Sequence, residues 1–201
     1  MIMSLSRRVP LLPPLFVAAT IFFSLTVFAD ESHKQVCVGK DCFSSAAMVG
    51  KERLPLLGAT QFRYLFFHVY SIALYGPKGV NTSAGILSDI PKKLVLRYHH
   101  RFTRDQIVKG GDEMMRRNPE VNFASIADAV SQMATLYMES VHEEDEYAVV
   151  YQPGQGISLY FNGEFRGSVP GAEFARAYFG IWLSNASIDD EMRDALLGRN
   201  S

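Results

Sequence analysis

The clearest pattern of apolar and polar positions lies in the last third of the chain. From Tyr147 it predicts three short strands, separated by turns at Pro153-Gly154 and at Asn162-Gly163. The Asn-Gly dipeptide tolerates the positive φ values of a tight hairpin turn. The helix predicted over 172–183 is apolar on both flanks, with Phe174 on one and Trp182 on the other, which is typical of a buried helix.

A second apolar stretch, Leu54 to Tyr75, is rich in aromatic and β-branched residues and ends at Gly76-Pro77. These features predict a strand. Residues two apart share a face of a strand, and both faces here are largely apolar, so we expect one central strand covered on both sides. A long loop over 76–91 and a strand over 93–102 follow.

The middle of the chain has helical periodicity. Thr103-Arg104-Asp105-Gln106 fits a capping box and predicts a helix that continues to about Arg117. Apolar residues at helical spacing predict a second helix over 123–141, and Asp189 to Leu197 predicts a short last helix. Because the strands cluster at both ends and the helices lie between them, we expect an α+β fold with an antiparallel sheet and helices on one face.

The 201 residues suit one domain, over 51–201, preceded by a lead-in segment over 30–50. Residues 1–29 are interpreted as a signal peptide, because Arg7 and Arg8 precede an apolar run from Leu11 to Phe28, and Val27-Phe28-Ala29 fits a cleavage site. The alternative is an uncleaved membrane anchor, although Pro13-Pro14 would weaken a helix there. We expect membrane contact only through such an uncleaved segment.

Cysteine content agrees with export to the periplasm or the medium, and the net charge does not indicate a nucleic-acid partner. The formal net charge is −1, and becomes −3 when Arg7 and Arg8 are removed, without the clustered basic face of a nucleic-acid-binding protein. The two cysteines, Cys37 and Cys42, allow a short-loop disulfide in an oxidising compartment, free thiols, or part of a metal site. Two thiolates alone do not complete a zinc shell, so we expect no metal.

Motifs for nucleophilic, nucleotide or metallopeptidase chemistry are absent from the sequence. His99 and His100 are adjacent on a predicted strand, so they point to opposite faces and do not chelate one ion. Glu143-Glu144-Asp145-Glu146 is a solvated acidic turn or, alternatively, a metal or partner site. We expect no cofactor.

The candidate ligand-binding residues are Arg63, Tyr64, Tyr70 and Tyr98. Arg63 lies on an otherwise apolar strand face. A buried guanidinium stays charged and needs a partner, so it pairs with a carboxylate, lies at an exposed strand end or binds an anionic ligand. The three tyrosines offer hydroxyl donors nearby, or are core aromatics with hydroxyls at the rim.

Three blocks of the chain resemble the chalcone isomerase-like superfamily, and specifically its exported bacterial branch. They are Leu57 to Tyr75, the strand from Lys93 to Phe102 with its following helix, and Gly156 to Leu183 with the Asn-Gly hairpin. The resemblance implies an open-faced β-sandwich, in which helices cover a large antiparallel sheet and leave a ligand cleft between the layers.

The resemblance also implies two kinds of site. Members of the superfamily either cyclise chalcones, with an arginine, a threonine and tyrosines, or bind fatty acids through an arginine and a tyrosine. Arg63 matches the family arginine, Tyr70 stands where the enzymes place threonine, and the segment 76–92 lacks the enzymes' tyrosine. We therefore expect a non-catalytic binder of a fatty-acid-like or other amphipathic anion, with an intramolecular lyase (isomerase) and an envelope interaction scaffold as alternatives.

Overall fold

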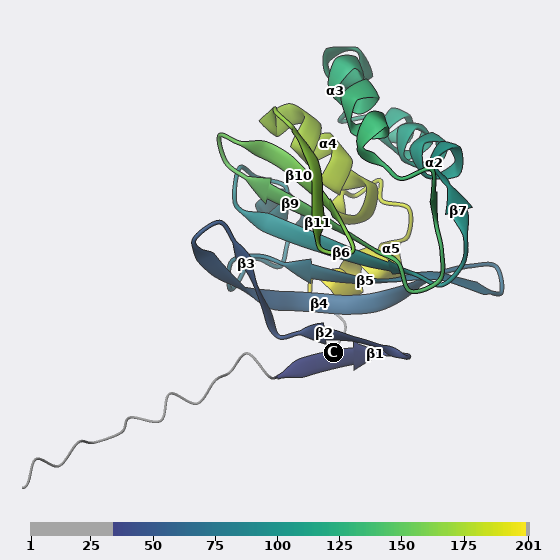
Figure 1. Ribbon diagram of the computed structural model, residues 1–201. Helices are drawn as coiled ribbons and strands as arrows, with labels where there is room; N and C mark the ends of the chain where they lie inside the picture. Colours follow the sequence, from purple (N-terminus) through teal and green to yellow (C-terminus); the bar gives the residue numbers. More distant parts are fainter. Residues whose placement is uncertain (1–33, 200–201) are drawn as a thin grey trace, which may run out of the picture. The chain divides into compact units, whose positions relative to one another are not determined.

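The computed structural model describes residues 34–199, so the expected signal peptide lies outside the described residues. A seven-stranded antiparallel sheet, in the order β11-β10-β9-β6-β5-β4-β3, forms its centre (Figure 1). Its strands are β3 (Ala46–Val49), β4 (Glu52–Tyr64), β5 (Phe67–Tyr75), β6 (Lys92–Tyr98), β9 (Glu146–Gln152), β10 (Gly156–Phe161) and β11 (Glu164–Val169). Two smaller antiparallel pairs join β1 (Gln35–Val38) to β2 (Asp41–Ser44), and β7 (Phe102–Thr103) to β8 (Ser140–Val141).

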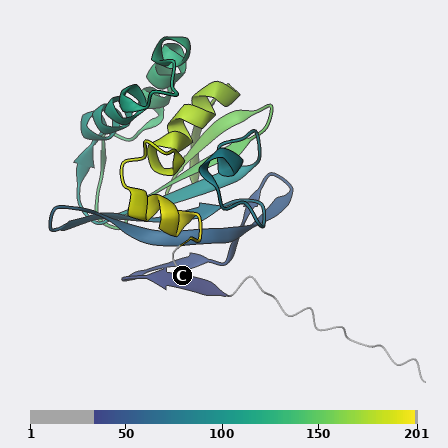
Figure 2. The same cartoon turned by 180° about the vertical axis from the view of Figure 1, so that it is seen from behind.

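The helices lie on one face of the sheet and the β1–β2 hairpin lies on the other, as both views show (Figures 1 and 2). The helices are α1 (Ser83–Ile86), α2 (Arg104–Arg117), α3 (Phe123–Leu136), α4 (Ala172–Leu183) and α5 (Asp190–Leu196). This arrangement confirms the α+β architecture expected from the sequence. None of the helices within residues 34–199 combines the length and the apolar content that crossing a bilayer requires.

Each face of the sheet has its own apolar core. On β5, Ile72 and Leu74 pack under the helices, whereas Ala73 and Tyr75 pack on the opposite side with Phe43 of β2. Successive side chains of a strand point to opposite faces, so one strand supplies both cores. The central, doubly covered position expected for this region therefore belongs to β5.

The single strand expected over 54–75 is wrong, because the chain turns back on itself at Leu65-Phe66 to form the β4–β5 hairpin. No glycine, proline or asparagine marks this turn, and Leu65 itself adopts a φ of +54°. Such a value is unusual for a branched side chain. The turn therefore carries no local sequence signal that the apolar pattern could have revealed.

Other local signals are confirmed. Thr103 and Gln106 form the reciprocal capping box of α2. Asn162 and Gly163 have φ values of 49° and 83°, as the hairpin turn requires. The expected helix over 123–141 ends earlier, at Leu136, since the following residues continue to the short strand β8.

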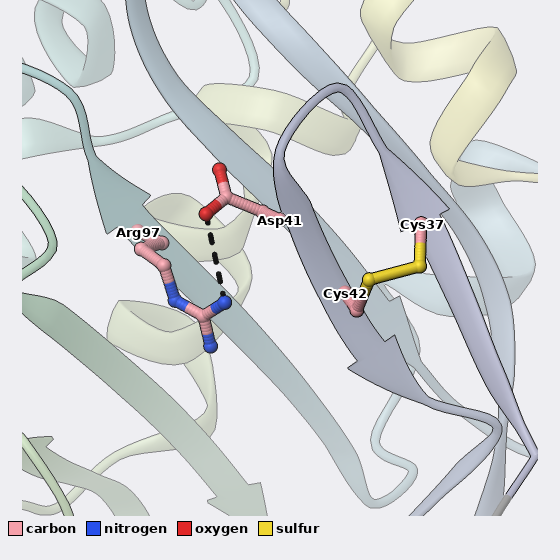
Figure 3. Close-up of a disulfide and its surroundings, with 4 residues drawn as sticks. All are labelled: Cys37, Asp41, Cys42 and Arg97. Atoms are coloured by element: carbon pink, nitrogen blue, oxygen red, sulfur yellow. Dashed lines mark ion pairs between the residues drawn. A yellow bond between two sulfur atoms is a disulfide. The ribbon is translucent and has the colours of Figure 1, made fainter.

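The segment expected as a lead-in contributes three strands within its described part. The structure joins Cys37 of β1 to Cys42 of β2 in a disulfide (Figure 3). Asp41, beside this bond, is buried against the sheet, where His99 Nε2 lies 2.7 Å from its carboxylate and Arg97 Nη1 lies 3.6 Å from it. The hairpin is thus attached to the sheet by a buried ionic contact as well as by apolar packing of Phe43.

Candidate ligand-binding cavity

An open cavity of about 210 Å³ lies between the sheet and the helices. Its walls come from β4, β5, β6 and β9 on one side, and from α2 and α4 on the other. Its aliphatic and aromatic lining includes Phe62, Val69, Leu96, Met114, Val149 and Ile181. The described residues that line it carry no charge, so the cavity is suited to an apolar molecule or to the apolar part of one.

Polar groups in the wall come from an aromatic cluster made of Tyr70, Tyr98, Tyr137, Tyr147, Tyr178 and Trp182. Most of these groups bond to protein. Trp182 Nε1 donates to the Tyr70 hydroxyl at 2.9 Å, and the hydroxyls of Tyr137 and Tyr178 bond to each other. The Tyr147 hydroxyl accepts a bond of 2.7 Å from the Met138 backbone N–H.

Tyr98 differs from the other four tyrosines of the cluster, because its hydroxyl makes no hydrogen bond to any residue within 34–199, whereas theirs all do. Burial raises the pKa of Tyr98 well above 10, and the neighbouring tyrosines Tyr137 and Tyr70 raise it further. Burial likewise raises the pKa of Tyr137, and the contact with Tyr178 adds to the effect. These groups are therefore neutral at physiological pH, and the Tyr98 hydroxyl is free to bond to a ligand.

The mouth of the cavity lies beside the first half of α2. Gln106 and Gly110 line it and are exposed. The Gln106 carboxamide oxygen accepts the Thr103 backbone N–H at 2.8 Å, which leaves its amide N–H groups available for other partners. A polar group at this position would meet both water and an amide donor.

The structure places two of the four candidate residues in the wall and two outside it. Tyr70 and Tyr98 line the cavity, but Arg63 and Tyr64 do not. A register shift in the β4–β5 pairing lies between Phe62 and Arg63, so Phe62 faces the cavity with Tyr70 while Arg63 pairs with His68. The ring of His68 lies 6.2 Å from that of His99, on the face of Asp41. The sheet therefore separates the Arg63 guanidinium, which is exposed, from the cavity.

Sequence reasoning missed four members of this aromatic cluster: Tyr137, Tyr147, Tyr178 and Trp182. The apolar pattern treats their rings as core residues, which is correct because all four are buried. Three of them have polar atoms that meet partners far away in sequence, since Tyr137 and Tyr178 are 41 residues apart and Trp182 and Tyr70 are 112 apart. The available signal is the residue type itself, because buried tyrosine and tryptophan usually find a hydrogen-bond partner.

A second polar cluster, on the opposite face, has the composition of a catalytic triad without its geometry. Ser71 Oγ lies 3.2 Å and Asp41 Oδ2 2.7 Å from the same ring nitrogen, Nε2 of His99. A relay of this type needs the two ring nitrogens to have different partners. Burial by itself would raise the pKa of Asp41, but hydrogen bonds from Ser71 and His99, and the charges of His99 and Arg97, hold it below 3.8. The cluster is a structural attachment for the hairpin.

Metal chemistry has no candidate within residues 34–199. No group of three or more His, Cys, Asp or Glu side chains there is arranged to hold an ion. His99 and His100 do not form a pair: His99 is buried beside Asp41, while His100 is exposed and packs against Phe67. Of the acidic turn, Glu143 pairs with Lys40 and Glu146 with Arg97.

Comparison with known proteins identifies the fold. The crystal structure of a fatty-acid binding protein from Arabidopsis thaliana is similar, with a TM-score of 0.65 and 14% sequence identity, covering 82% of this chain and 96% of that one. At this identity the likeness concerns the fold. No curated protein matches the chain. The profile of the family described as chalcone isomerase-like matches residues 38–198, which is most of the sequence. The chain belongs to the chalcone isomerase-like family.

Proposed function

We propose that this protein binds a fatty-acid-like or other amphipathic small molecule in the cavity between sheet and helices, without transforming it. The observation that carries the proposal is an open cavity whose described wall is uncharged and rich in aromatic groups. Such concave, mostly apolar sites with a few placed polar groups are typical of small-molecule binding. The similarity to a fatty-acid binding protein supports the same ligand class.

The wall dictates how an amphipathic anion would lie. Burying an ionised carboxylate without a cationic partner is costly. The hydrocarbon part therefore occupies the interior, and the ionised head stays at the mouth, near the Gln106 amide and water. The Tyr98 hydroxyl donates to a polar atom within the ligand or to a trapped water. This orientation requires no role for Arg63.

The uncharged wall also argues against the isomerase alternative. Cyclisation of a chalcone develops negative charge on oxygen, and a preorganised cation or donor set must stabilise it. The hydroxyls of Tyr70, Tyr137 and Tyr178 are engaged with one another or with Trp182. We propose binding, and turnover of a chalcone by the purified protein would contradict it.

The test is titration with cis-parinaric acid, whose fluorescence rises when its chain enters an apolar site. The blocking variant is Gly111→Leu, because a Cβ at Gly111 would meet Ile181 Cδ1 of the cavity wall at 3.7 Å. We expect this variant to bind at least about tenfold more weakly, a loss of about 1.4 kcal/mol. Gly111→Ala is the matched control and should bind as the parent does.

Two further outcomes separate this orientation from the sequence-based hypothesis. Arg63→Ala should leave the affinity unchanged, whereas a large loss would restore Arg63 as the ligand anchor. Equal affinity of Gly111→Leu and the parent, with the variant folded by circular dichroism, would refute the cavity as the site.

We further propose that the protein acts outside the cytoplasm, in the periplasm or the medium. The support is the signal-like sequence of residues 1–29 and the short-loop disulfide between Cys37 and Cys42, a bond that persists in oxidising compartments. Expression in a bacterial host followed by fractionation and intact mass measurement tests it. We expect a periplasmic chain that begins at Asp30 and is two hydrogens lighter than the reduced form; a cytoplasmic chain that retains residues 1–29 would contradict the proposal.

A further inference from the structure

The tip of the β4–β5 hairpin exposes four consecutive large apolar residues, which we name the apolar tip. Their exposed fractions are 65% for Tyr64, 76% for Leu65, 94% for Phe66 and 62% for Phe67. The other exposed large apolar residues within 34–199 are scattered singly. Contiguous apolar surface of this kind is uncommon on soluble proteins and marks contact with another apolar surface.

The tip projects beyond the rest of the sheet. Tyr64 still pairs with Phe67, but the last backbone bond from the neighbouring chain segment runs from His99 N to Val69 O at 3.0 Å. The hairpin therefore continues about 7 Å past its neighbour, at about 3.3 Å per residue. Figure 1 shows the β4–β5 hairpin reaching past the end of β6. This length matches the depth to which peripheral proteins enter a bilayer interface, about 5–10 Å.

The turn holds the tip in a defined shape. Leu65 adopts a φ of +54°, where glycine or asparagine would be relaxed. Backbone strain of this type tends to occur at functional positions. Leu65 thus combines an unfavourable backbone conformation with an exposed apolar side chain. Neither feature stabilises the fold of the chain on its own.

Unpaired cations flank the apolar tip. Arg63 directly precedes it, and the ring of His100 packs edge-on against Phe67 at 6.1 Å, which brings the next residue, Arg101, to the same end of the hairpin. Arg63 and Arg101 are exposed and form no ion pair with a residue in the described part of the chain. The neighbouring acidic turn is engaged by Lys40, whose Nζ lies 2.5 Å from Glu143.

From these observations we infer that the apolar tip docks into an anionic lipid surface. Aromatic and aliphatic side chains enter the interface of a bilayer, while arginines beside them bind the headgroups. Phe62 and Val69, which line the cavity, lie on the same two strands within two residues of the tip. Docking would bring the cavity to the lipid surface and so give a lipid-derived ligand a short route into it. This consequence rests on the proposed function, whereas the docking itself does not.

The first test places a reporter on the tip. In Phe66→Trp of the full chain, emission should shift to the blue with vesicles of phosphatidylcholine and phosphatidylglycerol, and lipids brominated high on their chains should quench it. Phe165→Trp is the matched control, since Phe165 is exposed on β11, and it should show neither effect. The reporter is local because the apolar run from Leu11 to Phe28 could itself hold the chain on lipid. An unshifted, unquenched Trp at position 66 would overturn the inference.

The second test removes the contact. Phe66→Asp should weaken vesicle binding at least about tenfold, because a charge replaces a phenyl ring that docking would bury in the bilayer interface. Phe165→Asp should not. Arg63→Gln with Arg101→Gln should reduce binding to the anionic vesicles and leave binding to pure phosphatidylcholine unchanged. Lys78→Gln, at the opposite end of β5, should change binding to neither kind of vesicle.

Two outcomes would identify another role for the tip. Vesicle binding unaffected by Phe66→Asp, together with an unshifted and unquenched Trp at position 66, would refute docking. A change from dimer to monomer in Phe66→Asp by light scattering, without lipid, would assign the tip to a second copy of this chain and also refute it. Binding of cis-parinaric acid without vesicles should be the same in Phe66→Asp and the parent, so failure of docking and failure of ligand binding are distinguishable.

Discussion

Lys92 allows a prediction in which both sign and size follow from the structure. Its side chain is only 2% exposed, its Nζ donates to the Ser88 carbonyl at 2.9 Å, and it lies 4.3 Å from the centre of the Tyr151 ring. Burial lowers the pKa of Lys92 from 10.5 to about 8, although the charge of Asp89 opposes the shift. Folding therefore disfavours the ammonium form.

The sign follows from proton linkage. Between the folded pKa near 8 and the unfolded value of 10.5, the unfolded chain binds more protons, so the free energy of unfolding rises with pH. The cost of burying the charged lysine is fully present below pH 8 and is relieved above it. At 1.36 kcal/mol per pH unit, the relief between pH 7 and pH 9.5 amounts to about 2 kcal/mol.

The perturbation is Lys92→Met, which keeps the length of the side chain and removes the titration. Urea unfolding of parent and variant at pH 7 and pH 9.5, followed by circular dichroism, measures the difference. The parent should gain about 2 kcal/mol relative to the variant over this interval. Titration of the tyrosines is common to both proteins and cancels. Lys78→Met, at an exposed lysine, is the control for removal of a positive charge. Parallel pH dependence of the parent and Lys92→Met would refute the reasoning.

Three other expectations concern the two faces of the sheet. The disulfide between Cys37 and Cys42 closes only a short loop. Substitution of both cysteines by serine should therefore lower the free energy of unfolding by only about 2 kcal/mol, as measured by urea unfolding, and reductant should lower that of the parent by the same amount. Asp41→Asn should flatten the loss of stability on acidification, because the depressed pKa of Asp41 contributes stability that disappears as pH falls below 3.8; equal acid unfolding of parent and variant would contradict this. Trp182→Phe removes the donor to the Tyr70 hydroxyl and should cost about 1 kcal/mol in urea unfolding, whereas Tyr70→Phe in the Trp182→Phe background should add less than it does alone.

Much of the fold follows from local sequence signals. The capping box at Thr103, the turn at Asn162-Gly163 and the all-round apolar helix at 172–183 each act within a few residues of the chain, so their structures depend little on distant partners. The antiparallel sheet with helices on one face follows in turn from the order of these elements.

The faces of the β4–β5 hairpin did not follow from sequence. Alternation assigns faces only while the strand continues without interruption, and here a turn at Leu65 and a register shift after Phe62 both break it. A shift by one residue exchanges the two faces of a strand. Arg63 consequently lies on the face opposite to the cavity, and the residue that looked most like a ligand anchor is a flank of the apolar tip.

The pairing of the polar groups in the cavity wall did not follow from sequence, because the partners are far apart along the chain, and this pairing bears directly on selectivity. Because Trp182 bonds to Tyr70, and Tyr137 to Tyr178, the cavity has little unsatisfied polar surface when it is empty. A ligand therefore gains mainly from burying apolar area and filling the available shape, with the Tyr98 hydroxyl as the free internal donor among the described residues. A cavity built in this way discriminates by length and width of the apolar chain more than by the chemistry of the head group, since the head remains at the mouth. Saturated fatty acids that differ in length should accordingly differ more in affinity than a fatty acid and its alcohol of equal length, and competition against cis-parinaric acid measures both differences. A larger effect of the head group would show that a charged partner holds the ligand, and would contradict this account of the uncharged wall.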